Sequence, residues 1–358
     1  MSKYKKYTFI VVLFLIITFI LHSLIWNLIS KHVLLVDDMV YTGDLGRSTF
    51  KLDSIYPRPS YLNKNAITLP KKHLSFNDID GKNIDIITVG DSFSNAATQG
   101  QNPYYQDYIA TINNCNVLNI PPSLGIINTI IVLNNNGILD ELKPKSIIIE
   151  SVERLAIQRY SQTINFAQFQ RKSKVIKTLK TQKNLYLGKD SEINIINNHN
   201  IKAIKYNMQF LVNPYSTYSN SNIVKLNRNF FTSKDENSLM FHKEDISSLS
   251  RTNKESINKL NDNLNKLAEV LSDKGIKLYF MPVVDKYNVY SKYIVNNPYP
   301  KSTFFEELRK LPKEYEFIDT KAILSKELEK GVKDLYYSDD THWSYKASEA
   351  IFKKVRFE

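Results

Sequence analysis

The sequence predicts an α/β protein with a mostly parallel central sheet and an N-terminal transmembrane helix. Five short apolar segments are typical of buried strands, at 84–89, 116–120, 146–150, 276–282 and 315–318. Helical patterns lie between or after them, at 125–142, at 345–355 and at 257–271, where one face carries Ile257, Leu260, Leu264, Leu267 and Leu271. Strands that alternate with helices favour a parallel sheet covered on both faces, and such sheets bind ligands at the carboxyl ends of their strands.

The N-terminal helix is predicted from an almost wholly apolar run at residues 8–29, which is long enough to cross a bilayer core. Lys3, Lys5 and Lys6 precede the run, so the positive-inside rule places the N-terminus in the cytoplasm and the rest of the chain outside. A cleavable signal peptide is the alternative, but its apolar region would be shorter and would end in small residues. We therefore expect an uncleaved single-pass anchor in the cell membrane.

Composition limits the classes of partner. The chain has 358 residues and a net charge of +12, and it carries no zinc-ligand spacing, aromatic RNA-binding motif or basic heptad region. An anionic membrane face or cell-wall polymer therefore suits the charge better than nucleic acid does. The single cysteine, Cys115, allows neither an internal disulfide nor a cysteine metal cluster, and we expect no cofactor or metal.

Three parts are predicted along the chain. Residues 1–30 form the cytoplasmic tip and the anchor, and residues 31–82, with several Gly and Pro, form a stalk or entry segment. Residues 83–358 form the catalytic domain. Within this domain, residues from about 155 to 250 are expected to form a basic insertion. Their hydrophobic pattern is less periodic, and they include 14 Lys and Arg against 6 Asp and Glu.

Gly90, Asp91 and Ser92 directly follow the first predicted strand. A serine on such a turn lies at the carboxyl edge of the sheet, where backbone N–H groups at the start of a following helix can bind a developing oxyanion. Gly90 would permit the tight turn. The alternative is that Asp91 or Ser92 only caps the next helix.

The second candidate segment contains His342. A serine hydroxyl needs an adjacent base, and that base needs a carboxylate to orient it. Among the six histidines, His342 has acidic residues immediately upstream, Asp339 and Asp340, and an aromatic residue, Trp343, beside it. We therefore predict Ser92 as the nucleophile and His342 as its base. The alternative is that His342 is a surface-loop histidine.

Together the two segments resemble the first and last motif blocks of the SGNH (GDSL-type) hydrolase superfamily. The branch that O-acetylates exopolysaccharides, such as the alginate O-acetyltransferases, is similar in three stretches: Asp340-Thr341-His342-Trp343, Glu150-Ser151-Val152-Glu153-Arg154 and Met281-Pro282-Val283-Val284-Asp285-Lys286-Tyr287. The resemblance spans roughly 83–155 and 251–355. It implies a flavodoxin-like three-layer fold and acyl-ester chemistry.

This sequence departs from the family pattern in two ways. In the alginate enzymes the Asp-x-His segment precedes the serine, whereas here the serine comes first, as in ordinary members of the superfamily. The usual D-x-x-H spacing selects Asp339 as the triad acid and the D-x-H-W phrase selects Asp340; we give Asp339 a slight preference.

The second departure is that the family's glycine and asparagine, which bind the oxyanion, are not evident in this sequence. Gly125 falls where the glycine would lie. Arg154 lies where the asparagine would, and it could stabilise an oxyanion, bind an anionic sugar, or form an ion pair with Glu150 or Glu153.

The leading functional hypothesis is an O-acyltransferase that acetylates a cell-surface or exported polysaccharide through an acyl-serine. Because acetyl-CoA is absent outside the cell, this function implies a membrane-bound O-acyltransferase partner that exports the acyl group. A carbohydrate esterase or deacetylase with the same triad is a second hypothesis. A non-catalytic polysaccharide-binding or assembly protein is a third.

Overall fold

The computed structural model describes residues 3–32, 35–36, 39–40, 44–45, 67–95, 102–181, 221–233 and 235–357. At its centre is a five-stranded sheet in which every pairing is parallel. The spatial order is β4-β3-β5-β8-β9, from β4 (Val117–Asn119), β3 (Ile86–Val89), β5 (Ser146–Val152), β8 (Lys277–Val283) and β9 (Glu316–Phe317). Numbered along the chain, this is the 2-1-3-4-5 order of flavodoxin-like sheets. The predicted α/β fold class is confirmed.

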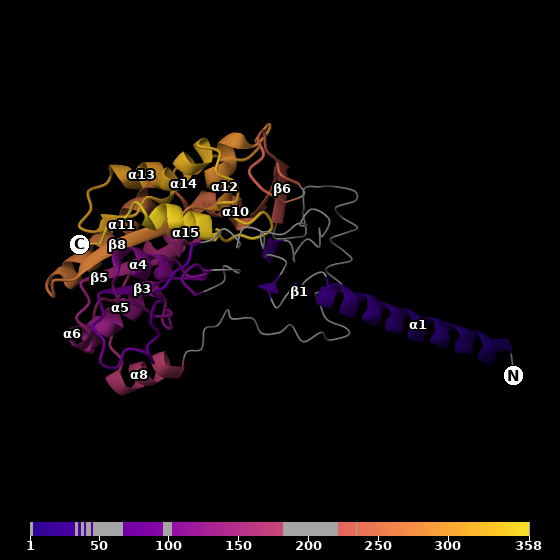
Figure 1. Cartoon of the computed structure of the whole chain (residues 1–358), viewed down its shortest axis with the longest axis horizontal. Helices are drawn as coiled ribbons and strands as arrows, with labels where there is room; N and C mark the ends of the chain where they lie inside the picture. The colour runs from indigo at the N-terminus through magenta and orange to yellow at the C-terminus, as the bar shows by residue number, and fades with distance from the viewer. Residues whose placement is uncertain are drawn as a thin grey trace.

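Helices cover both faces of the sheet (Figure 1). On one face, three helices pack against one another: α4 (Tyr105–Asn113), α14 (Thr320–Glu329) and α15 (Tyr345–Phe352). Because crossovers between parallel strands are right-handed, the helices that connect β4 to β5 and β5 to β8 lie on the opposite face. These are α5 (Ile126–Asn135), α7 (Glu153–Tyr160) and α11 (Lys254–Ser272), and α13 (Phe304–Lys310) packs against α11. The chain direction reverses beside β3, so its carboxyl end is the switch point where such folds bind ligands.

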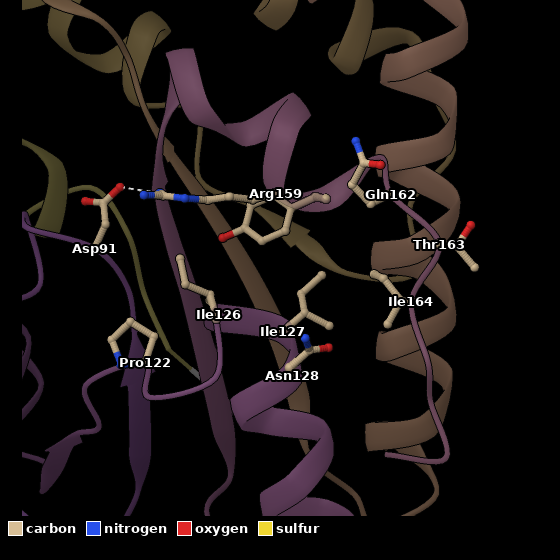
Figure 2. Close-up of a pocket in the computed structure, with 11 residues that line it drawn as sticks. Asp91, Pro122, Ile126, Ile127, Asn128, Arg159, Gln162, Thr163 and Ile164 are labelled. Carbon is tan, nitrogen blue, oxygen red and sulfur yellow. Dashed lines mark hydrogen bonds and ion pairs between the residues drawn. The ribbon is translucent and has the colours of Figure 1, made fainter.

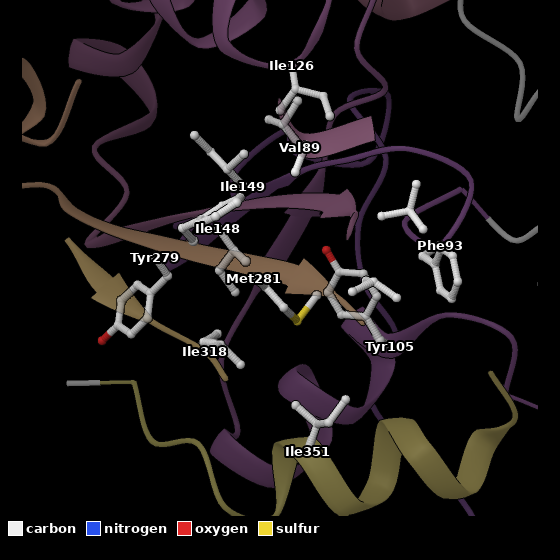
Figure 3. Close-up of a cluster of buried hydrophobic side chains, with 14 of the residues drawn as sticks. Val89, Phe93, Tyr105, Ile126, Ile148, Ile149, Tyr279, Met281, Ile318 and Ile351 are labelled. Atoms are coloured by element: carbon white, nitrogen blue, oxygen red, sulfur yellow. The ribbon is translucent and has the colours of Figure 1, made fainter. Parts of the chain in front are cut away.

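The apolar pattern of the sequence predicts which residues form the buried core. All five apolar residues predicted to share one face at 257–271 are buried in α11, each contributing about 1.5–3 kcal/mol relative to exposure. Asn253 and Ser256 form a reciprocal capping box that satisfies N–H groups at the start of this helix. Side chains of β5 and β8, such as Ile148 and Met281, pack with aromatic and aliphatic residues of the helices (Figure 3).

Several element boundaries differ from the prediction. Residues 125–142 were expected to be one helix, but they form α5 and a separate α6 (Ile138–Leu142). Gly137 between them has a φ of 79°, a left-handed conformation that stops the first helix. Strand β3 starts at Ile86, two residues later than expected. Strand β5 continues to Val152, two residues further than expected.

Parts of the predicted insertion and entry segment have regular structure. Between 155 and 250 lie α8 (Lys172–Thr181), an antiparallel pair formed by β6 (Ser221–Lys225) and β7 (Ser238–His242), α10 (Glu244–Ser247) and the 3₁₀ turn η2 (Ser248–Arg251). Residues 182–220 lie outside the described residues. In the predicted entry segment, β1 (Leu35–Val36) pairs with β2 (Met39–Val40), and Leu74 lies beside Leu118 of β4. After β8 the chain forms α12 (Lys286–Tyr290) and the 3₁₀ turn η3 (Ser291–Tyr293).

The N-terminal α1 (Lys3–His32) projects away from the sheet domain (Figure 1). Its segment Lys3–Ile25 is long and apolar enough to cross a membrane, and none of its most apolar window is buried against the protein. A signal sequence at this position would have the same properties. The described residues therefore include one candidate membrane span.

Candidate active site

The nucleophile turn, residues 90–95, leaves the carboxyl end of β3 and carries a partly exposed Ser92. Gly90 was expected to allow a tight turn through its backbone freedom, but crowding is the actual reason for a glycine. A Cβ at this position would lie 2.7 Å from the Cβ of Glu150, and it would overlap the Ser94 hydroxyl and the Glu150 carboxyl group. The turn therefore packs directly against β5.

Asp91 fixes this turn to the neighbouring strand and helix. Its Oδ2 accepts hydrogen bonds from the Val152 N–H (2.9 Å) and from Arg159 (2.5 Å), and its Oδ1 accepts one from the Phe93 N–H (3.2 Å). Burial acts to raise the pKa of Asp91, but the Arg159 guanidinium and the Val152 N–H outweigh it and hold the pKa below its usual range. An ionised Asp91 thus connects the turn to β5 and α7.

Glu150 lies beneath the turn and is fully buried. Its Oε2 accepts from the Asp91 N–H (2.9 Å) and from the Ser94 hydroxyl (2.7 Å), whose oxygen is 2.9 Å from the Tyr105 hydroxyl. Burial and the nearby charge of Asp91 raise the pKa of Glu150 well above its ordinary value. A carboxyl group in such a site is favoured in its neutral form.

His342 lies between Ser92 and Asp340. Its Nε2 is 2.8 Å from the Ser92 Oγ, and its Nδ1 is 2.6 Å from Oδ1 of Asp340, which also accepts from the His342 backbone N–H (2.9 Å). Burial acts to lower the pKa of His342, but the charges of Asp340 and Asp44 outweigh it and raise the pKa. This is the geometry of a serine–histidine–carboxylate relay.

The preference for Asp339 as the carboxylate is wrong. With a spacing of two residues, the Asp340 side chain turns back to meet both the backbone N–H and the ring of His342. Asp339 is also buried, and its charge acts on Lys286. The D-x-H-W phrase therefore identifies the partner of the histidine better than the D-x-x-H spacing does.

Lys286 positions the histidine loop, residues 338–344. Its buried ammonium group donates to the carbonyl oxygens of Tyr337 (2.6 Å), Ser338 (2.9 Å) and Asp340 (3.0 Å). Burial lowers the pKa of Lys286 to about 8, against the opposing charges of Asp339 and Asp340. Its location just after β8, at the carboxyl edge of the sheet, is the sequence signal for this role.

Asp44 is a site residue that the sequence did not reveal. It falls in the predicted stalk, and no motif marks it. Its backbone N–H donates to Oδ2 of Asp340 (3.1 Å), and its carboxylate accepts from the Thr341 N–H (2.8 Å) and hydroxyl (2.5 Å). The oxygens of Asp44 and Asp340 and a His342 nitrogen lie within 4.8 Å of one another, a spacing that could hold a metal ion. However, both ring nitrogens are already engaged, with Ser92 and Asp340, which favours a proton relay over a metal centre.

Arg154 and Gly125 were the predicted oxyanion residues. The Arg154 guanidinium is bound by two buried carboxylates, at 3.3 Å from Asp245 and 3.0 Å from Asp285. The alternative that Arg154 forms an ion pair is therefore right, but its partners are not Glu150 or Glu153. Glu153 instead accepts hydrogen bonds from Asn288, Ser302 and the Asp285 N–H. Within the described part of the chain, the Ser92 N–H has no protein acceptor, which leaves it available to an oxyanion.

Gly125 lines a cavity of about 300 Å³ beside the nucleophile turn (Figure 2). The cavity lies between the start of α5 and the end of α7, and Asp91 and Arg159 meet at its edge. Gly125 precedes α5 with a φ of 86°, a conformation that favours glycine. The lining combines polar and apolar side chains: Asn128, Tyr160, Gln162 and Thr163 with three isoleucines and a proline, Ile126, Ile127, Ile164 and Pro122.

The comparisons with known proteins agree with this geometry. Residues 237–356 match the family described as SGNH hydrolase-like domain, acetyltransferase AlgX. Residues 237–356 are therefore similar to an SGNH hydrolase-like domain, and the predicted family resemblance is confirmed over this segment. The matched segment includes Lys286, Asp340 and His342, whereas Ser92 comes from the part before it. No curated protein and no solved structure matches the chain.

Proposed function

We propose that this protein is a membrane-anchored, extracytoplasmic O-acyltransferase that acetylates hydroxyl groups of a polysaccharide. The observation that carries the proposal is the relay in which Nε2 of His342 lies 2.8 Å from Ser92 Oγ while Nδ1 lies 2.6 Å from Asp340. It is supported by the family match, because the matched domain is that of an acetyltransferase.

In the first half-reaction, Ser92 Oγ attacks the acyl carbonyl and its proton passes to Nε2 of His342. The tetrahedral oxyanion accepts a hydrogen bond from the Ser92 N–H, with Gly125 and Arg154 as further candidates. The imidazolium, stabilised by Asp340, then protonates the departing group of the donor. In the second half-reaction His342 deprotonates a sugar hydroxyl, which attacks the acyl-serine and releases Ser92.

The cavity lined by Asp91, the residue before Ser92, is the proposed acceptor site. Its volume of about 300 Å³ lies at the lower end of the range for small-molecule sites, which suits one sugar unit of a longer chain. Asp91 and Arg159 neutralise each other at its edge, so the lining carries no net charge from this pair. A charge-balanced cavity with both polar and apolar walls suits a neutral hydroxyl-bearing acceptor.

The proposed location rests on α1. The lysines at its N-terminal end favour a cytoplasmic N-terminus, so the sheet domain would work outside the cell. Since acetyl-CoA is absent there, a membrane-bound O-acyltransferase would supply the acyl group. The polysaccharide, this partner and the membrane are the proposed interaction partners.

The test uses the full chain in detergent, with p-nitrophenyl acetate as donor and neutral oligosaccharides as acceptors. The wild type is expected to form acetylated oligosaccharide, and Ser92→Ala should reduce the rate by about 10³-fold or more. Ser272→Ala, an exposed change at the end of α11, is the matched control and should retain activity. Acetylated oligosaccharide at an undiminished rate from Ser92→Ala would overturn the proposal. Donor hydrolysis that is unaffected by oligosaccharide would assign the protein as an esterase instead.

A further inference from the structure

Asp44 and Leu45 are the first described residues after β2 (Met39–Val40) and are here called the anchor-proximal pair. Asp44 accepts two hydrogen bonds from Thr341, the residue between the two relay members Asp340 and His342. Its own N–H donates to Oδ2 of Asp340, the oxygen that does not face the imidazole. Three hydrogen bonds therefore connect this pair to the histidine loop.

Leu45 gives the pair a second, independent attachment. It is buried in a small apolar cluster with Ile223 of β6 and Met240 of β7. The β6–β7 pair thus holds the anchor-proximal pair from one side, while the histidine loop contacts it from the other. A residue attached in this way can position the loop rather than merely lie on it.

We propose that Asp44 is a positioning residue of the relay, so that the segment leaving the membrane anchor completes the catalytic centre. Asp44 orients the Asp340 carboxylate and fixes Thr341, and its negative charge stabilises the protonated form of His342. The inference rests on the proposed serine chemistry of this site and adds a carboxylate that the three-residue relay does not contain.

The short segment between α1 and Asp44 limits how far the relay can lie from the membrane. Asp44 comes twelve residues after the end of α1 at His32. A chain of that length spans at most about 40 Å even when fully extended. With α1 in a membrane, Ser92 would therefore work close to the membrane surface, where an acyl donor emerging from a membrane partner is accessible.

The charged groups that face His342 define the test. Asp340 on its own loop and Asp44 from the anchor-proximal pair raise the pKa of His342, while burial and Arg154 from α7 lower it. Burial and the charge of Asp340 raise the pKa of Asp44, whereas His342 and the hydrogen bonds from Thr341 to both carboxylate oxygens act to lower it. Asp44→Asn keeps the shape of the side chain and removes its charge, and it should therefore lower the pKa of His342.

The experiment is an NMR titration of the His342 imidazole in the full chain, assigned through its absence in His342→Gln. Asp44→Asn should lower the midpoint by about one pH unit. It should also slow the labelling of Ser92 by a sulfonyl fluoride at high pH, by about tenfold. Thr341→Val removes one donor to Asp44 but no charge, so it should slow labelling without a comparable shift of the midpoint.

Asp262→Asn, the same charge change on the exposed face of α11, is the control and should alter neither quantity. An unchanged His342 midpoint in Asp44→Asn would overturn the proposal, whatever happens to the labelling rate. The absence of acetyl transfer by the wild type would instead overturn the proposed function, and the titration would remain interpretable because it needs no turnover.

Discussion

The nucleophile turn and the histidine loop meet at the same serine, but they are built in different ways. The nucleophile turn continues from strand β3, and its supports come from the adjacent β5 and α7: Glu150, Val152 and Arg159. The histidine loop belongs to no strand. Its supports are single side chains from distant parts of the sequence, Lys286 after β8 and Asp44 near the N-terminus.

Because of this difference, we expect mutations in the two regions to have different effects on stability and on catalysis. The nucleophile turn shares its packing with the core of the sheet, so a change there should cost folding stability and function together. The histidine loop is positioned by a few polar contacts, so changes there should act mainly on catalysis. The two regions contact each other through the hydrogen bond between His342 and Ser92, and through the Phe93 ring, which packs against His342 and Trp343 with centroid distances of 4.6 Å and 5.0 Å.

The largest effect is expected from Asp340→Asn, which tests the histidine loop. An asparagine cannot stabilise the imidazolium and favours the wrong tautomer, so kcat should fall by about 10³–10⁴-fold with little change in thermal stability. The measurement is the rate of acetyl release from a chromogenic ester as a function of pH. Asp339→Asn, the matched change one residue earlier, should cost less than tenfold; if it cost as much as Asp340→Asn, the assignment of the relay carboxylate would be wrong.

Gly90→Ala tests the nucleophile turn. The added methyl group would meet Glu150 and Ser94, so the turn and β5 would have to separate. We expect a loss of about 1–3 kcal/mol in the free energy of unfolding, together with slower labelling of Ser92. Thermal unfolding of the detergent-solubilised chain measures the first quantity. A variant with normal stability but no labelling would show that the turn is not part of the shared core.

Lys286→Met should cost less stability than Gly90→Ala and less activity than Asp340→Asn. Methionine leaves three carbonyl groups without their shared donor, but it also removes the cost of burying an ammonium group. The net change in unfolding free energy should be about 1 kcal/mol, whereas kcat should fall about tenfold because the histidine loop loses its position. Equal losses of stability and activity, as predicted for Gly90→Ala, would remove the distinction between the two regions.

Much of the candidate site was predictable because both relay segments follow strong local patterns. The strand before Ser92 is apolar and short, and the Asp-Asp-Thr-His-Trp phrase is distinctive, so both segments were found without knowledge of their contact. The choice between Asp339 and Asp340 was not predictable, since it depends on how a tight loop folds back on itself. Arg154 was found as a candidate, but its partners Asp245 and Asp285 lie 91 and 131 residues away along the chain.

By itself, the sequence determined the α/β class, the apolar N-terminal helix, and the residue types of a serine–histidine relay. Each of these depends on spacing along the chain, which hydrophobic periodicity and short motifs record directly. Only the tertiary structure decided that Asp340 orients His342, that Gly90 is required by the approach of β5, and that Asp44 lies against the relay. These contacts join residues through packing and hydrogen bonds across the fold, and a local pattern carries no record of them.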